Sequence, residues 1–268
     1  MRLEDMIKEA VIIGDRHTPA HSEECDSILK EYMEDNSNRI SHFIDLGDCI
    51  DNPYMSDFPV SPWWKENAQE EFDMYAEFAK DIQKIAPKAQ YKIIAGNHDK
   101  GRLEDKRNLN RGIASLRNVE YENIMKEAMS SKGVNMKKVS FEDGEYDFKP
   151  TKSNTITLMH GDPRLNPYIK GGVTGTRRTA EGYPNGNDLI MGHKHKYEVF
   201  SRNYEGKICM VTDGLYDKDK MRAMYIAHHP YTNGFVRVLY DTKKDKRWID
   251  HITIEDGEAI IDGKKYRG

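Results

Sequence analysis

Short apolar runs that each stop at a glycine recur along the first two thirds of the chain. The first run is Ala10-Val11-Ile12-Ile13, and Gly14 follows it directly. A short apolar run that is closed by a turn signal predicts a buried strand. By this pattern we predict strands over residues 10–13, 39–46, 91–95, 156–159 and 188–191.

Segments with the spacing of an amphipathic helix lie between the first of these runs. Residues 66–86 place apolar side chains three or four positions apart, and Pro87 ends the pattern. Residues 27–33 predict a shorter helix, and the chain from about residue 199 onward is rich in strand and turn signals. Strands that alternate with helices predict an α/β fold. We expect residues 1–268 to form one domain, in which 199–268 complete the layers.

The charge and cysteine content exclude several classes of protein. The 41 Lys and Arg residues face 45 Asp and Glu residues, which gives a net charge of −4 and excludes a polybasic, histone-like binder. No apolar run reaches the roughly 18–20 residues of a membrane span, and the first ten residues lack the apolar core of a signal peptide. Three scattered cysteines, Cys25, Cys49 and Cys209, do not indicate disulfides. We therefore expect a cytoplasmic protein without a membrane partner.

Polar side chains with lone pairs follow each of the five predicted strands. The carboxyl ends of strands in an α/β sheet meet at one edge, so we expect these side chains to lie together. Imidazole and carboxylate ligands suit Mn, Fe, Zn, Co or Ni, and the lack of a CxxC pair excludes a thiolate zinc site. Seven ligands are too many for one tetrahedral ion and suit two ions that share a carboxylate. The candidate ligands are Asp15, His17, Asp48, Asn97, His160, His193 and His195.

Five short motifs stand in order over residues 14–195. They are Gly14-Asp15-Arg16-His17, Gly47-Asp48-Cys49-Ile50-Asp51, Gly96-Asn97-His98-Asp99, His160-Gly161 and Gly192-His193-Lys194-His195. With these motifs the sequence resembles the calcineurin-like metallophosphoesterase superfamily. The resemblance implies a four-layer α-β-β-α sandwich with a centre that holds two divalent metal ions, of which Mn is favoured and Fe, Zn, Ni or Co are alternatives.

The resemblance also implies a role for each motif residue. Asp48 would bridge the two ions, and His98 would be the catalytic histidine that binds no metal, oriented by Asp51. The remaining ligands would divide into Asp15, His17 and His195 for one ion, and Asn97, His160 and His193 for the other. Two such ions can provide a bridging hydroxide that attacks phosphorus in line with the leaving oxygen. His98 can then give a proton to that oxygen.

The motifs also narrow the substrate class. Asn52 and Asp99 stand where the protein Ser/Thr phosphatases of this superfamily have arginine and glutamate, so a phosphoprotein substrate is disfavoured. The nuclease pattern is closer. However, the nucleases that act on double-strand ends carry a capping domain, for which the roughly 70 residues after His195 are short.

Three segments between the motifs are candidates for substrate contacts. Trp63 and Trp64 could stack on a nucleobase or could anchor the helix that follows them. Lys100 and Arg102 lie in a basic segment over 100–111. The segment 163–178 is also basic and adds three glycines that suggest a loop ordered by substrate. Basic segments of this kind track phosphate backbones or are merely solvated loops. The basic candidates in 163–178 are Arg164, Lys170, Arg177 and Arg178.

Taken together, these features favour a dinuclear metal phosphodiesterase that acts on nucleic acid or a nucleotide. The alternative enzymes are a small-molecule phosphomonoesterase and a cyclic-nucleotide phosphodiesterase. The alternative that is not an enzyme is a binding module stabilised by metal. The oligomeric state is left open.

Overall fold

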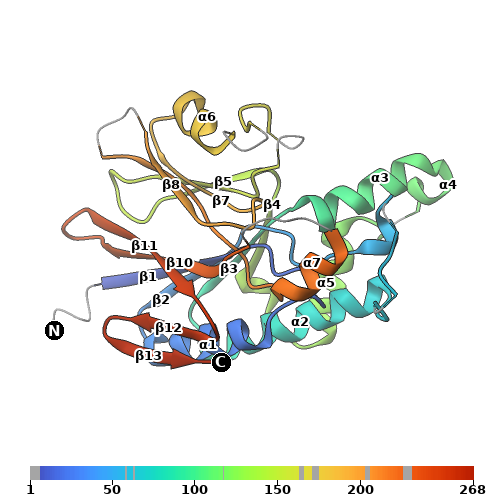
Figure 1. The fold of residues 1–268 in the computed structure, drawn as a ribbon, viewed down its shortest axis with the longest axis horizontal. Coiled ribbons are helices and arrows are strands. Elements are labelled where there is room, and N and C mark those ends of the chain that lie inside the picture. Colours follow the sequence, from blue (N-terminus) through green and yellow to red (C-terminus); the bar gives the residue numbers. More distant parts are fainter. Residues whose placement is uncertain are drawn as a thin grey trace.

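Two β-sheets pack face to face at the centre of the fold (Figure 1). The structure is a computed structural model that describes residues 7–57, 59–62, 64–116, 118–162, 166–170, 175–202, 206–225 and 231–268. The first sheet has the strand order β11-β10-β1-β2-β3-β4, and the second has the order β5-β6-β7-β9-β8. Neither order follows the chain, because helices and long loops connect the parallel strands.

The first sheet is mixed. Strands β1 (Ile7–Ile13), β2 (Ile40–Asp45), β3 (Gln90–Ile94) and β4 (Val139–Glu142) run parallel to one another. Strand β10 (Asn233–Asp241) pairs antiparallel with β1, and β11 (Lys246–Ile254) pairs antiparallel with β10. The C-terminal part of the chain thus completes one side of the sheet that the N-terminal part begins.

The second sheet repeats this arrangement on a smaller scale. Strands β6 (Ile156–Met159), β7 (Asp188–Met191) and β9 (Ile208–Val211) are parallel. Strands β5 (Glu145–Phe148) and β8 (Glu198–Ser201) form its two antiparallel edges. A separate hairpin of β12 (Glu258–Ile261) and β13 (Lys264–Arg267) packs against α1 (Glu23–Asn36).

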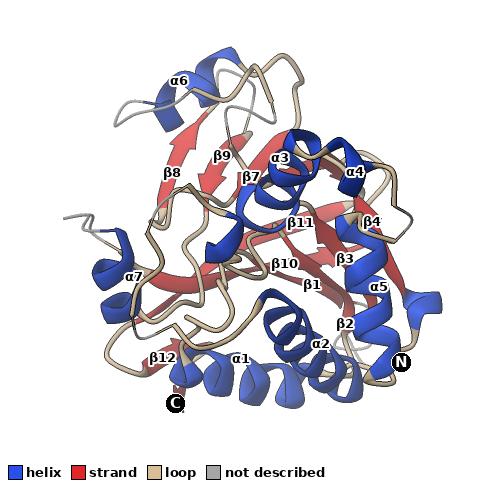
Figure 2. Ribbon diagram, turned by 90° about the vertical axis from the view of Figure 1, so that its right-hand side faces the viewer, coloured by secondary structure: helices blue, strands red, loops and turns tan. Residues whose placement is uncertain are grey.

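Helices cover the outer faces of both sheets (Figure 2). Helices α1, α2 (Ala68–Ile85) and α5 (Tyr121–Ser131) cover the first sheet, and α6 (Gly175–Gly182) covers the second. Three short helices lie outside these layers, together with the short helical turns Pro53–Met55, Asn97–Gly101 and Met136–Lys138. The three helices are α3 (Arg102–Leu109), α4 (Arg111–Ala114) and α7 (Lys218–Tyr225).

The alternation of side chains along β1 shows how the layers are held. Val11 and Ile13 pack toward the helices, whereas Ala10 and Ile12 pack between the sheets. All four are fully buried, as expected for a strand with a layer on each face. On the second sheet, Ile190 faces the first sheet while its neighbours in β7 face α6. The predicted four-layer α-β-β-α sandwich is therefore confirmed.

The predicted elements are also found. The five predicted strands correspond to β1, β2, β3, β6 and β7. The predicted helix 27–33 lies within α1, and the predicted helix 66–86 corresponds to α2, which is shorter by two residues at its start and one at its end. Helix α2 begins with a capping box, in which the side chain of Asn67 accepts from the amide of Glu70 and the Glu70 side chain accepts from the amide of Asn67. No helix among the described residues has the length and apolar content needed to cross a membrane.

Candidate metal centre

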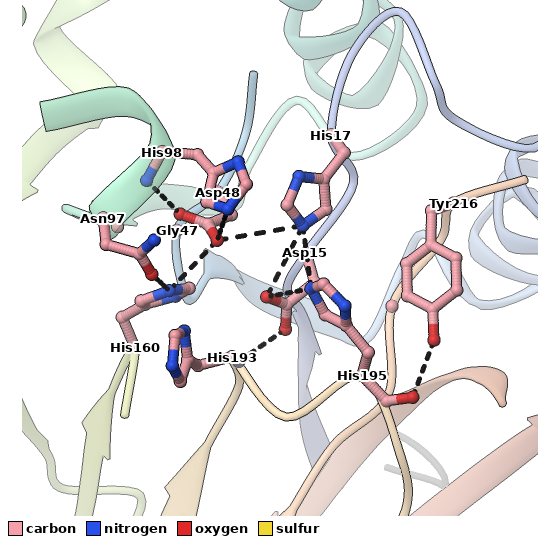
Figure 3. A network of polar contacts seen from close by, with 12 residues as sticks. Asp15, His17, Gly47, Asp48, Asn97, His98, His160, His193, His195 and Tyr216 are labelled. Carbon is pink, nitrogen blue, oxygen red and sulfur yellow. Dashed lines mark hydrogen bonds and ion pairs between the residues drawn. The ribbon is translucent and has the colours of Figure 1, made fainter. Parts of the chain in front are cut away.

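The seven predicted ligands lie together where parallel strands of both sheets end (Figure 3). Asp15 and His17 follow β1, and Asp48 follows β2. Asn97 follows β3 in the first sheet, while His160 follows β6 in the second. His193 and His195 come from the loop after β7. The shared edge that the apolar runs predicted therefore exists, and it draws on both sheets.

The loops that carry these side chains hold an uncommon backbone conformation. Five of the candidate ligands have a φ between 50° and 71°, in the left-handed region. Each such residue costs about 1–3 kcal/mol unless its surroundings hold it in place. They are Asp15, His17, Asp48, His193 and His195.

Close backbone packing provides that support. The amide of Asp15 donates to the carbonyl of Gly47 at 2.9 Å, and the amide of His17 donates to the carbonyl of Asp48 at the same distance. A Cβ on Gly96 would lie 2.2 Å from the amide nitrogen of Asp48, so only glycine allows these two loops to touch.

One group of ligand atoms gathers around Asp15. The side chains of Asp15, His17, Asp48 and His195 each offer one atom, and these atoms lie within 4.8 Å of one another. Nε2 of His195 lies 3.3 Å from Oδ1 of Asp15 and 2.9 Å from Nε2 of His17. Two imidazoles and two carboxylates form a donor set that suits a divalent transition metal.

A second group shares Asp48 with the first. Asp48, His160 and His193 also offer ligand atoms within 4.8 Å of one another. Nε2 of His160 lies 3.2 Å from Oδ2 of Asp48 and 2.8 Å from Oδ1 of Asn97. Asp48 therefore belongs to both groups, which suggests two ion positions with one carboxylate between them.

The buried lone pairs of the centre fit metal ions. Oδ1 of Asp15 and Oδ2 of Asp48 are buried without a hydrogen bond among the described residues. His17 donates Nδ1–H to Asp51 at 2.8 Å, and His160 donates Nδ1–H to the carbonyl of Leu46 at 3.0 Å. In the neutral rings, both Nε2 atoms then point lone pairs into the centre. Such convergence of acceptors is costly in a protein interior unless a cation lies between them.

The pKa shifts of two histidines also indicate that positive charge stabilises the centre. Burial lowers the pKa of His160, but the carboxylates of Asp48 and Asp15 outweigh burial and raise it to about 10. Burial lowers the pKa of His17 to about 4, and the hydrogen bond that its Nδ1–H donates to Asp51 opposes this shift only in part. A proton on His160 thus balances the buried carboxylates in the metal-free protein. A metal ion bound at this residue would replace that proton, since a histidine binds metal through an unprotonated nitrogen.

The comparison with protein families decides the identity of this centre. The family model described as Calcineurin-like phosphoesterase matches residues 10–230, which include every candidate ligand. The chain belongs to the calcineurin-like phosphoesterase family. Membership and the grouped Asp and His side chains together make it a metal-dependent phosphoesterase.

The comparisons with individual proteins add little beyond the family. No curated protein matches the chain. The chain is similar to the crystal structure of a hypothetical protein from Pyrococcus horikoshii OT3, at 12% sequence identity and a TM-score of 0.45. That similarity covers 92% of this chain and 89% of the other.

A hydrogen-bonded dyad of His98 and Asp51 borders the metal centre of this phosphoesterase. Nδ1 of His98 lies 2.8 Å from Oδ1 of Asp51, as expected of a histidine that an acid orients. The amide of His98 donates to Oδ1 of Asp48 at 2.8 Å, so the dyad is tied to the shared carboxylate. Arg102 donates from Nη1 to the carbonyl of Asp51 at 2.5 Å, and its Nη2 lies 3.4 Å from Nε2 of His98. Arg102 therefore lies near Nε2, the ring nitrogen of His98 that does not contact Asp51.

The predicted aromatic wall is not formed by Trp64. Only 5% of this side chain is exposed, and it packs with Ala20, Tyr216 and Met221. Its indole N–H donates to Glu71 at 3.0 Å. Trp64 anchors the loop before α2 and presents no open face to a base. Of the remaining predicted contacts, Trp63 and Arg164 lie outside the described residues.

Some of the predicted basic contacts form ion pairs with acidic side chains. Lys100 lies 2.7 Å from Asp143 in an ion pair, and Arg177 pairs with Glu181 at 2.8 Å on α6. Lys170 donates to the carbonyl of Pro167 at 3.2 Å, and Arg178 is exposed on α6. These ion pairs reduce the positive charge that the segments 100–111 and 163–178 present to a substrate.

Two residues that support the centre were not identified from the sequence. Asp99 is buried and accepts from the amides of Gly96, Lys100 and Cys49, at 2.7, 2.7 and 3.1 Å. It thereby joins the loops after β2 and β3. The other residue is Tyr216, whose hydroxyl reaches the backbone of His195. Asp99 stands in the Gly96-Asn97-His98-Asp99 motif, but its contact with Cys49 has no local signal, and neither has the contact of Tyr216 with His195.

Proposed function

We propose that this phosphoesterase is a dinuclear phosphodiesterase that hydrolyses phosphodiester bonds in nucleic acids or nucleotides. The observation that carries the dinuclear assignment is the position of Asp48, whose carboxylate belongs to both groups of ligand atoms. A single-ion site would leave the lone pairs of the second group without a cation.

The ligands would divide between two ions, with Asp48 shared by both groups. Asp15, His17 and His195 would hold one ion, and Nε2 of His195 lies 3.3 Å from Oδ1 of Asp15. Asn97, His160 and His193 would hold the other, and Nε2 of His160 and Oδ1 of Asn97 lie 2.8 Å apart. Imidazole, carboxylate and amide oxygen in this mixture favour Mn²⁺ or a similar divalent ion.

The side chains around the ions supply the other requirements of phosphoryl transfer. When bound, two divalent ions lower the pKa of a water molecule and neutralise charge on the phosphoryl group. His98 gives a proton to the leaving oxygen from Nε2, while Asp51 holds its Nδ1–H. The guanidinium of Arg102 lies 3.4 Å from Nε2 of His98, close enough to bind a phosphoryl oxygen that approaches this nitrogen.

The choice of a diester rests on the motif residues and on Arg178. Asn52 replaces the arginine found at its position in the phosphoprotein phosphatases, and Arg178 remains an exposed cation on α6. The second candidate is a small phosphomonoesterase. It is favoured by the ion pairs of Lys100 and Arg177, which reduce the charge available to a polyanion.

An assay with two kinds of substrate tests the proposal. End-labelled single- and double-stranded oligonucleotides and a nitrophenyl phosphomonoester are incubated with the protein and Mn²⁺. We expect cleavage of an oligonucleotide by the wild type, loss of cleavage in Asn97→Ala, and full cleavage in Asn38→Ala, whose side chain is exposed away from the ligands. Hydrolysis of the monoester alone would replace the diesterase by the second candidate.

A further inference from the structure

His195 differs from His17 and His160 in how its ring is held. The rings of His17 and His160 are each fixed by a hydrogen bond at Nδ1. In the part of the chain that the structure describes, no hydrogen bond is found at Nδ1 of His195. Metal-binding histidines usually have their second ring nitrogen fixed by a partner. The position of His195 therefore depends on its backbone and on the rings of Tyr216 and Tyr231 that pack against its imidazole.

Two donors hold that backbone at its carbonyl oxygen. The hydroxyl of Tyr216 lies 2.7 Å from this oxygen (Figure 3), and the amide of Thr232 lies 3.3 Å from it. The φ of His195 is 54°, a left-handed value that a non-glycine residue keeps only where contacts hold it. The ring of Tyr216 also lies against the imidazole of His195, with 5.0 Å between the ring centroids.

Tyr216 is itself firmly placed. Its side chain is fully buried, and its ring passes so close to Gly214 that a Cβ there would lie 2.5 Å from the ring. The side chain of Asn233 donates to the carbonyls of Gly214 and Tyr216 at 3.1 and 2.8 Å. The ring and the hydroxyl of Tyr216 are therefore fixed in place by their surroundings.

We propose that Tyr216 is a positioning residue that fixes His195 for metal binding. This inference rests on the proposed function, because it takes His195 as a ligand of one of two ions. The Tyr216 hydroxyl lies within 2.8 Å of the carbonyls of both His195 and Thr232, so it ties the loop after β7 to the residues before β10. Without it, His195 can leave the left-handed conformation. Only the ion at Asp15, His17 and His195 then loses a well-placed ligand.

The test compares metal binding in two matched Tyr→Phe variants. Tyr216→Phe removes the hydroxyl from the centre. Tyr240→Phe removes a hydroxyl from another buried tyrosine, whose partner is Ser41 at 2.6 Å in β2. Bound Mn²⁺ is counted per chain across a titration, and electron paramagnetic resonance distinguishes a coupled pair from a single ion. The unfolding temperature of the metal-free proteins shows that each variant is folded.

We expect a selective effect. Wild type and Tyr240→Phe should bind two Mn²⁺ ions as a coupled pair. Tyr216→Phe should bind the ion at His160 and His193 with unchanged affinity. It should bind the ion at Asp15, His17 and His195 about 10-fold or more weakly, so that its spectrum at intermediate Mn²⁺ concentration is that of a single ion. If Tyr216→Phe does not fold, Asn233→Ala loosens the same segment and should weaken binding of the ion at His195 by a smaller factor.

Three other results have distinct meanings. Unchanged binding of both ions in Tyr216→Phe would overturn the inference. Equal weakening of both ions would also overturn it, because the hydroxyl would then support the fold and not His195. A wild type that binds fewer than two ions would instead contradict the dinuclear assignment on which the inference rests.

Discussion

His17 and His98 share one hydrogen-bond acceptor, since Oδ1 of Asp51 lies 2.8 Å from Nδ1 of each ring. A carboxylate oxygen only accepts, so both rings carry a hydrogen on Nδ1 and point Nε2 away from Asp51. Nε2 of His17 then faces His195 at 2.9 Å, and Nε2 of His98 faces Oδ2 of Asp48 at 3.9 Å. One carboxylate thus orients a proposed metal ligand and the proposed proton donor together.

Replacement of Asp51 should therefore impair metal binding and turnover at the same time. In Asp51→Asn the neutral amide is a weaker acceptor for His17 and His98, and it can place an N–H group toward Nη1 of Arg102, which lies 3.4 Å from Oδ2 of Asp51. We expect kcat to fall about 100-fold and metal affinity to fall about 10-fold. Kinetics at saturating Mn²⁺ and a metal titration measure the two effects. Asp219→Asn, at a side chain that is 94% exposed, serves as the control. A change in only one of the two quantities would contradict the shared role.

His98 itself should affect turnover alone. His98→Ala removes the proton donor but none of the proposed ligands, so both ions should stay bound while kcat falls about 10²–10⁴-fold. The loss should be smaller for a nitrophenyl diester than for an oligonucleotide, because nitrophenolate leaves without a proton. Equal losses for the two leaving groups would remove His98 from the role of proton donor.

Asp48 should be more important for metal binding than any other ligand. Its Oδ2 lies 3.2 Å from Nε2 of His160 and 3.7 Å from Nε2 of His17, so it serves both groups. Asp48→Ala should abolish binding of both ions, whereas Asn97→Ala should weaken mainly the ion at His160 and His193. Metal analysis after gel filtration measures the ions that each variant retains. Two tightly bound ions in Asp48→Ala would contradict the bridging assignment.

Much of the fold could be predicted because local pattern and burial agree. The run Ala10-Val11-Ile12-Ile13 is apolar on both sides, and β1 indeed has a layer on each face. The candidate ligands could be named because each directly follows such a run. By contrast, the position of β10 beside β1 depends on a pairing between residues more than 200 positions apart, which no local pattern indicates.

The supporting contacts of the site could not be predicted for the same reason. Tyr216 and Thr232 reach His195 only once three distant segments are folded together. The sequence around Trp64 allows either a surface aromatic or a core residue, and only its neighbours in the fold distinguish the two. The sequence of helix α3, RLEDKRNL, has no apolar stripe. The pattern of apolar positions therefore does not predict this helix.

The stability of the fold should fall in acid through His42, which lies away from the metal centre in β2. Burial lowers its pKa to about 4, and Lys92 adds to this effect. In the unfolded chain His42 binds a proton near pH 6.5, whereas in the folded protein it binds one only near pH 4. Protonation therefore favours the unfolded chain, and the folded state loses stability as the pH falls from 6.5 to 4. We expect His42 to account for about 2 kcal/mol of that loss. Urea unfolding of wild type and His42→Gln at pH 7 and pH 4.5 measures it, and equal pH dependence in the two proteins would contradict the assignment.

Binding of a nucleic acid should depend on the exposed cations of α6. Arg177 is 71% exposed and shares its charge with Glu181, whereas Arg178 is exposed on the same helix. If a phosphate backbone crosses α6, the double variant Arg177→Ala and Arg178→Ala should bind oligonucleotides more weakly. The slope of log affinity against log salt should then fall by about 1–2, since each phosphate contact releases close to one counterion. Fluorescence anisotropy from 50 to 200 mM salt gives this slope, with His98→Ala as the background because its turnover is expected to be slow.

The matched control is Lys264→Ala with Lys265→Ala in the β12–β13 hairpin, which should leave the slope unchanged. An unchanged slope in the α6 variant would mean that these arginines are solvated surface charges, and it would favour a small substrate.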